Sequence, residues 1–146
     1  MGEASQRGDV FAEIEQAFGL VPEWLKLLPE EALAGSWTLL RDFYFGETSL
    51  PGKYKELIGI AVAGATRCRY CQLFHTEAAR LQGATDAEIA EAAEMGGVTM
   101  MASTFINGMA LDLDDFRDET RKVIAYVRRQ RAARAARPEG GDHVRH

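Results

Sequence analysis

Residues 56–75 have the sequence ELIGIAVAGATRCRYCQLFH and contain both cysteines of the 146-residue chain, Cys68 and Cys71. In the first part of this segment apolar residues recur at helical spacing. Pro51 precedes it at a position that suits the first turn of a helix, and Gly83 follows it as a helix stop. The segment therefore predicts two consecutive helices, with the cysteine pair at the start of the second.

The same periodicity extends through the N-terminal part of the chain. Apolar residues step by three and four over residues 11–18 and again over residues 33–44, and each run is followed by a glycine, Gly19 or Gly46. A short turn between two prolines, over residues 22–29, separates the runs. These patterns predict two helices joined by a turn.

Two further helices are predicted after residue 84. Residues 85–88, TDAE, form a capping box that begins a helix extending to about Asn107, with a bend allowed at the Gly96–Gly97 pair. Asp112 or Asp114 then caps a last helix. On this last helix a buried side is predicted, made of Phe116, Val123, Ile124 and Val127. Core packing is the predicted role of a second apolar group, and the alternative is that it lines a pocket or a seam between subunits. The members of this group are Met95, Met100, Met101, Phe105 and Met109.

The length and composition predict one folded domain. The chain is 47% hydrophobic and 27% charged, which excludes disorder as its main state, and 146 residues leave no room for two ordinary domains. No window alternates with period two, so we expect an all-α, single-domain bundle of about six or seven helices over residues 1–137, with a flexible tail over residues 138–146. A domain of this size needs no disulfide for stability, so the two cysteines require another explanation.

Charge and terminal features exclude several classes of protein. Residues 117–137 hold eight basic and two acidic residues, whereas the rest of the chain is acidic, which argues against a nucleic-acid partner. No stretch approaches the roughly 18 unbroken apolar residues of a membrane span. The N-terminal residues lack the basic and apolar regions of a secretory signal, so we expect a cytoplasmic, reducing location. In that compartment a Cys-x-x-Cys pair indicates redox or metal chemistry.

Helix geometry relates the histidine at position 75 to one cysteine more than the other. At about 100° per residue, Cys71 and His75 differ by roughly 40° and one turn, whereas Cys68 and His75 are two turns, about 10 Å, apart. His75 is therefore expected to reach Cys71 but not readily Cys68.

The cysteine pair has the features of a two-thiol redox centre. Cysteines at i and i+3 of a helix have Cα atoms about 5 Å apart, inside the range for a disulfide. The free N–H groups at a helix start stabilise a thiolate, and Arg67 and Arg69 add positive charge nearby. A lower thiol pKa favours attack on a peroxide or a disulfide at neutral pH.

Two other interpretations of these residues stay open. The cysteines could be a structural pair that packs like small apolar residues. A zinc site could instead use Cys68, Cys71, His75 and Glu56, although no second cysteine pair completes the usual ligand set. Glu56 lies beside an apolar run, which favours a carboxylate that points into a pocket.

The spacing Glu-x11-Cys-x2-Cys-x3-His resembles the signature of the alkylhydroperoxidase D-like branch of the carboxymuconolactone decarboxylase family. Here the pattern falls on Glu56, Cys68, Cys71 and His75. The resemblance covers roughly residues 21–127 and implies an all-helical fold assembled as homo-oligomers, either trimers or hexamers. It also implies an antioxidant oxidoreductase, a thiol peroxidase that needs no cofactor and no metal.

The resemblance assigns a role to each residue of the signature. Cys71 is the expected peroxidatic thiol and Cys68 the resolving thiol, with Glu56 and His75 relaying the proton. The family's peroxidase has a histidine directly before the second cysteine, whereas this chain has Tyr70. A tyrosine, with a pKa of about 10, is a poor proton shuttle but can donate a hydrogen bond.

The leading hypothesis is therefore a peroxidase or disulfide oxidoreductase whose redox-active disulfide is reduced by an external dithiol, either a lipoyl group or a thioredoxin-like protein. The first alternative is a cofactor-free lyase, like carboxymuconolactone decarboxylase, on the same fold. The second alternative is a non-enzymatic oligomer that binds metal or acts as a scaffold.

Overall fold

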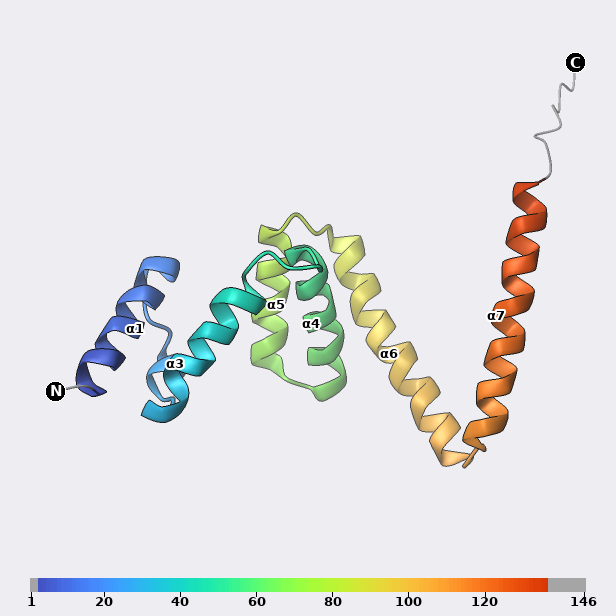
Figure 1. The fold of residues 1–146 in the computed structure, drawn as a ribbon, viewed down its shortest axis with the longest axis horizontal. Helices are drawn as coiled ribbons and strands as arrows, with labels where there is room; N and C mark the ends of the chain where they lie inside the picture. Colours follow the sequence, from blue (N-terminus) through green and yellow to red (C-terminus); the bar gives the residue numbers. More distant parts are fainter. Residues whose placement is uncertain (1–2, 137–146) are drawn as a thin grey trace, which may run out of the picture. The chain divides into compact units, whose positions relative to one another are not determined.

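The computed structural model describes residues 3–136, and every regular element within this range is helical (Figure 1). In chain order the elements are α1 (Glu3–Phe18), α2 (Glu23–Lys26), α3 (Glu30–Thr38), the π-helix η1 (Leu39–Tyr44), α4 (Gly52–Thr66), α5 (Arg69–Leu81), α6 (Asp86–Gly108) and α7 (Leu113–Ala135). The all-α prediction is confirmed.

Contacts divide the chain into two units, Met1–Met100 and Met101–His146. The expected single domain over residues 1–137 stays a prediction. The predicted tail, residues 138–146, lies outside the described residues.

The N-terminal helices of the first unit pack around a small apolar core. Val10 and Ile14 on α1 meet Leu25, Leu33 and Trp37, all of them buried. Gly19 ends α1 with φ 77°, a backbone conformation that only glycine adopts without strain, and the predicted stop is confirmed. This core anchors α3, from which the chain runs directly into η1.

The π-helix η1 is the one element that periodicity did not predict. It continues α3 without a break, and its last bond runs from the Phe45 N–H to the Leu40 carbonyl, a spacing of five residues. A single π-helical turn inserts extra backbone into a helix and is frequent at functional sites. Its last residue is Tyr44.

Helices α4 and α5 form a helical hairpin and pack side by side (Figure 1). Pro51 directly precedes α4, as predicted. At the other end Arg67 adopts the left-handed conformation, and the N–H groups of Arg67 and Cys68 donate to the carbonyls of Gly64 and Ala63. This tight reversal places Cys68 directly before α5, at the N-cap position of that helix.

Helix α6 begins with the predicted capping box. The Thr85 N–H donates to the Glu88 carboxylate at 2.8 Å, and the Glu88 N–H donates to the Thr85 hydroxyl at 3.1 Å. Along α6 a Cβ at Gly96 would lie 2.7 Å from the Ala61 carbonyl oxygen of α4, so the absent side chain permits close helix packing.

In the second unit Asp112 caps α7, accepting from the N–H groups of Asp114 and Asp115. The predicted buried side of this helix is not buried within this unit: its four apolar side chains are 37–59% exposed, because none of the unit's described elements covers them. Core packing is likewise wrong for the second apolar group, whose members are 48–67% exposed. A pocket or a seam between subunits is the alternative that remains for them.

Within residues 3–136, none of the helices combines the length and the hydropathy that a membrane span requires.

Candidate active site

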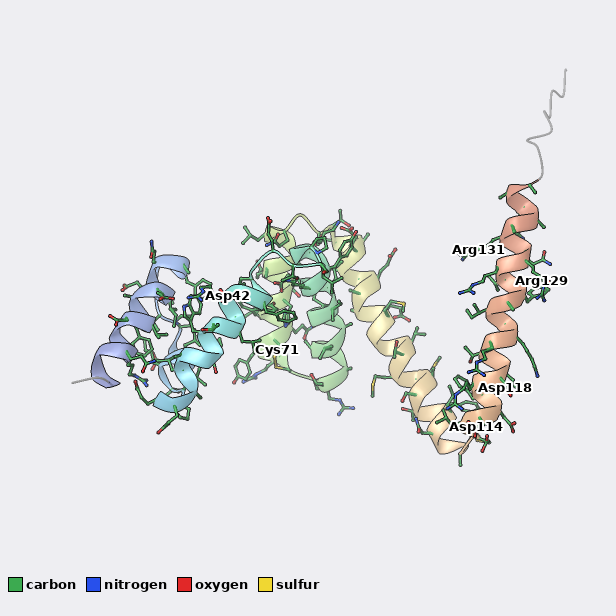
Figure 2. The ribbon with its side chains drawn as sticks, viewed as in Figure 1. Asp42, Cys71, Asp114, Asp118, Arg129 and Arg131 are labelled. Carbon is green, nitrogen blue, oxygen red and sulfur yellow. A yellow bond between two sulfur atoms is a disulfide. The ribbon has the colours of Figure 1, made fainter. Side chains whose placement is uncertain are left out.

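The cysteine pair lies at the start of α5 and is joined as a disulfide, with Cα atoms 5.3 Å apart. Cys68 is the N-cap residue, and its sulfur accepts a hydrogen bond from the Cys71 N–H at 3.3 Å. Cys71, labelled in Figure 2, lies in the first turn of the helix. A sulfur at either position is thus near the positive end of the helix dipole, where a thiolate is stabilised.

Glu56 lies on α4 and is the one buried charged side chain among the described residues, with 4% of its surface exposed. Its Oε2 atom is 2.8 Å from Nδ1 of His75 and accepts a hydrogen bond from the Tyr44 hydroxyl at 2.7 Å. The Tyr44 hydroxyl is also 3.0 Å from His75 Nδ1. Three polar groups from η1, α4 and α5 therefore meet at one point.

Burial raises the pKa of Tyr44 far above its ordinary value, and the hydrogen bond to Glu56 and the negative charge of that carboxylate add to the effect. Tyr44 therefore keeps its proton at any physiological pH and acts only as a hydrogen-bonding group.

Gly59 provides the space for the imidazole of His75. A Cβ at this position would collide with Nδ1 and Cε1 of the His75 ring. The ring thus packs directly on the backbone of α4, one turn after Glu56. Close approach of α4 and α5 at this position sets the distance between the carboxylate and the imidazole.

A cavity of about 540 Å³ opens beside these groups, and both Cys71 and His75 line it. Most of the remaining wall is apolar, formed by side chains such as Phe43, Leu50, Ile58, Val62 and Ala63. An apolar wall lowers the local dielectric and so strengthens electrostatic interactions at a reacting sulfur. The arrangement can bring an apolar molecule to Cys71 with a proton acceptor close by.

The structure brings together Glu56 and His75 at hydrogen-bond distance, and it brings Cys71 and His75 to one cavity. It does not bring Tyr70 to this cluster. The Tyr70 side chain is 73% exposed, its hydroxyl accepts a hydrogen bond from Arg69 at 3.3 Å, and the guanidinium lies 5.1 Å from the ring centre. Over the part of the chain that the structure describes, no group of three or more His, Cys, Asp and Glu side chains is arranged to hold a metal ion.

Sequence reasoning missed Tyr44. The periodic pattern placed it at the end of an apolar stripe, where it was indistinguishable from a core aromatic. The available signal was weak: a hydroxyl-bearing side chain two residues before Gly46, at the point where the stripe ends. Its partners lie 12 and 31 residues away, so no local pattern reports the contact.

Comparison with known proteins gives two curated relatives. An alkyl hydroperoxide reductase of Mycobacterium tuberculosis is 38% identical over 84 residues, which is 53% of this chain but only 23% of that protein's own length. An uncharacterized protein of the cox locus of Paracoccus denitrificans is 34% identical over 77 residues, covering 49% of this chain and 69% of the relative.

A solved structure has the same fold. The alkylhydroperoxidase AhpD core of Rhodospirillum rubrum superposes with a TM-score of 0.65 at 28% identity, covering 74% of this chain and 82% of the other. The family model for carboxymuconolactone decarboxylases matches residues 31–107, a range that contains Tyr44, Glu56, both cysteines and His75. The chain therefore belongs to the carboxymuconolactone decarboxylase family and resembles its alkylhydroperoxidase D-like members.

Proposed function

We propose that the protein is a thiol peroxidase that reduces organic hydroperoxides through reversible formation of the Cys68–Cys71 disulfide. The observation that carries this proposal is the position of Cys71: it forms a disulfide with the helix-capping Cys68 and shares an apolar cavity with His75. The similarity to an alkyl hydroperoxide reductase and to an alkylhydroperoxidase core supports it. The broader form of the proposal is a disulfide oxidoreductase.

In the first step the Cys71 thiol transfers its proton to His75, which is hydrogen-bonded to Glu56, and the thiolate attacks the hydroperoxide. A sulfur–oxygen bond forms at Cys71 while the oxygen–oxygen bond breaks. The sulfur is oxidised to a sulfenic acid, and the leaving alkoxide takes the proton held by His75 and becomes an alcohol.

In the second step the Cys68 sulfur attacks the sulfenic sulfur of Cys71. The disulfide forms, the sulfur–oxygen bond breaks, and hydroxide leaves as water with the proton of Cys68. The Cα separation of 5.3 Å permits this bond without unfolding α5. An external dithiol, a lipoyl group or a thioredoxin-like protein, then reduces the disulfide by thiol exchange.

We further propose that the working protein is a cytoplasmic homo-oligomer, a trimer or a hexamer. The exposed apolar side chains of α6 and α7 support self-association, because single chains rarely leave large contiguous apolar areas in water. Neither a nucleic acid nor a membrane is part of the proposal.

The direct test mixes fully reduced protein with an organic hydroperoxide and counts free thiols over time. The chain has two cysteines, so any loss of thiol must come from Cys68 and Cys71. We expect two thiols lost and one alcohol formed per chain. Unchanged thiols at excess hydroperoxide would contradict the proposal, and activity on a lactone acid that survives replacement of both cysteines by serine would support a lyase instead.

Single replacements separate the two cysteines. Cys71→Ser should abolish reaction with the hydroperoxide, whereas Cys68→Ser should react once and leave a sulfenic acid that a dimedone-type reagent traps at Cys71. The opposite pattern would show that the peroxidatic and resolving roles are inverted.

A further inference from the structure

We infer that Tyr44 is a positioning residue that holds His75 in the tautomer with its proton on Nδ1, leaving Nε2 as the nitrogen that can accept a proton. The catalytic consequence rests on the proposed peroxidase function. The tautomer itself does not, because it follows from the geometry of three side chains and can be measured without turnover.

The geometry allows one consistent placement of protons when Glu56 is a carboxylate. An ionised carboxylate only accepts hydrogen bonds, so the Tyr44 hydroxyl at 2.7 Å and the His75 Nδ1 at 2.8 Å must both donate to Oε2. The imidazole is then protonated on Nδ1. Nε2 makes no hydrogen bond to any residue between 6 and 136, so it is the ring nitrogen left for an incoming proton.

The competing placement shows what Tyr44 contributes. If Tyr44 donated instead to Nδ1, at 3.0 Å, the lone pairs of Nδ1 and Glu56 would face each other at 2.8 Å unless the carboxyl carried a proton. Donation from Tyr44 gives the buried Glu56 oxygen a second hydrogen bond beside the one from His75, and a buried polar group without such partners is costly. Without that hydroxyl Glu56 keeps a single donor among the described side chains, so one of the contacts that fix the proton on Nδ1 is lost.

The chain holds the Tyr44 backbone firmly enough for such a role. Lys55, the neighbour of Glu56 on α4, donates from Nζ to the carbonyls of Phe43 at 2.6 Å, Tyr44 at 3.3 Å and Gly46 at 2.8 Å. One ammonium group thus ties the C-terminal end of η1 to the helix that carries Glu56. The Tyr44 ring also makes an edge contact with Phe45, with centroids 4.7 Å apart.

The decisive variant is Tyr44→Phe, which removes the hydroxyl and keeps the ring. The chain is labelled with ¹⁵N, and long-range ¹H–¹⁵N spectra of the histidine rings report which nitrogen is protonated. A His75→Asn sample identifies the His75 signals among those of the three histidines. We expect the Nδ1–H form alone in the wild type and an increased Nε2–H population in Tyr44→Phe. Tyr126→Phe, at an exposed position on α7, is the matched control and should give the wild-type spectrum.

A kinetic measurement then connects the tautomer to turnover. The rate of thiol oxidation by hydroperoxide should fall about tenfold or more in Tyr44→Phe, since a positioned general base typically contributes 10²–10⁴-fold to a rate. In the variant part of the His75 population carries its proton on Nε2, so that nitrogen can no longer act as the base. Tyr126→Phe should keep the wild-type rate. Wild-type tautomer populations in Tyr44→Phe would overturn the inference, whatever the wild-type activity. A wild-type protein that does not react with hydroperoxide would overturn the proposed function and leave the tautomer measurement valid.

Discussion

At the scale of single residues, the absence of a side chain at Gly59 decides how the proposed proton relay is built. The His75 ring occupies the space that a Cβ at position 59 would need. A displaced ring would lose its contact with Glu56, and the buried carboxylate would then lack one of its two donors.

Gly59→Ala is therefore expected to lower the rate of thiol oxidation by about tenfold or more, since general base catalysis depends on placement within hydrogen-bond reach. The variant should also be less stable by about 1–3 kcal/mol, as is usual when an extra carbon is forced into a packed site. Stopped-flow oxidation and chemical denaturation measure the two effects.

Gly64→Ala is the matched control on the same helix, because a Cβ at Gly64 meets no atom within 4 Å. Alanine favours a helix over glycine by about 0.5–1 kcal/mol, so this variant should be as stable as the wild type or slightly more stable. Equal rates for the two alanine variants would show that Gly59 does not position His75.

At the scale of elements, one carboxylate both caps α6 and connects it to α4. Glu88 accepts from the Thr85 N–H, and its Oε1 atom forms an ion pair with Lys53 at 2.7 Å. The Lys53 hydrogen bond lowers the pKa of Glu88 below its ordinary value of 4.5, and the Thr85 N–H lowers it further. The two helices are thus tied together at their N-terminal ends.

Glu88→Gln tests the charge separately from the cap, because glutamine also closes a capping box. A carboxyl whose pKa is lower in the folded chain stabilises it fully above the unfolded value of about 4.5, and this contribution is lost as the pH falls through the folded pKa. The variant should therefore be less stable than the wild type at pH 7, and the difference should shrink in acid. Denaturation at pH 7 and at pH values below about 4 checks this.

Glu94→Gln makes the same change of charge on the same helix at an exposed position. It should leave stability nearly unchanged at both pH values, as surface substitutions usually do. A loss of stability in Glu88→Gln that did not depend on pH would mean that the ion pair with Lys53 contributes nothing.

At the scale of the whole molecule, the apolar face of α7 supports the proposed self-association. Four apolar side chains follow helical spacing on this helix and are 37–59% exposed within the second unit: Phe116, Val123, Ile124 and Val127. An amphipathic stripe of this width normally faces a partner surface.

Ile124→Asp places a charge on this stripe and is expected to shift the protein toward smaller species in sedimentation velocity experiments. Burying an unpaired carboxylate in an interface is strongly unfavourable, so the dissociation constant of the oligomer should rise. A larger share of the variant should then be dissociated at micromolar concentration. Lys122→Gln changes the net charge by the same amount on the other side of the helix and should assemble like the wild type. Identical sedimentation of both variants and the wild type would exclude this face from the interface.

The sequence by itself determined the local structure of this protein. Helical spacing, the Thr85–Glu88 capping box, the glycine stops at Gly19 and Gly83 and the proline before α4 all act within a few residues, and all are present in the structure. The same local rule predicted that Cys68 and Cys71 lie within disulfide distance at the start of a helix. Such features follow from sequence because backbone geometry relates neighbouring residues at fixed angles and distances.

Only the tertiary structure decided which distant side chains meet. Tyr44 reaches Glu56 and His75 because a π-helical turn and the Lys55 contacts set the path of the chain before α4, and the His75 ring fits because α4 has no side chain at Gly59. The exposed face of α7 was likewise not predictable, since periodicity shows which side of a helix is apolar but not what covers it. Contacts between helices depend on how their surfaces pack, and that information is spread over residues far apart in the sequence.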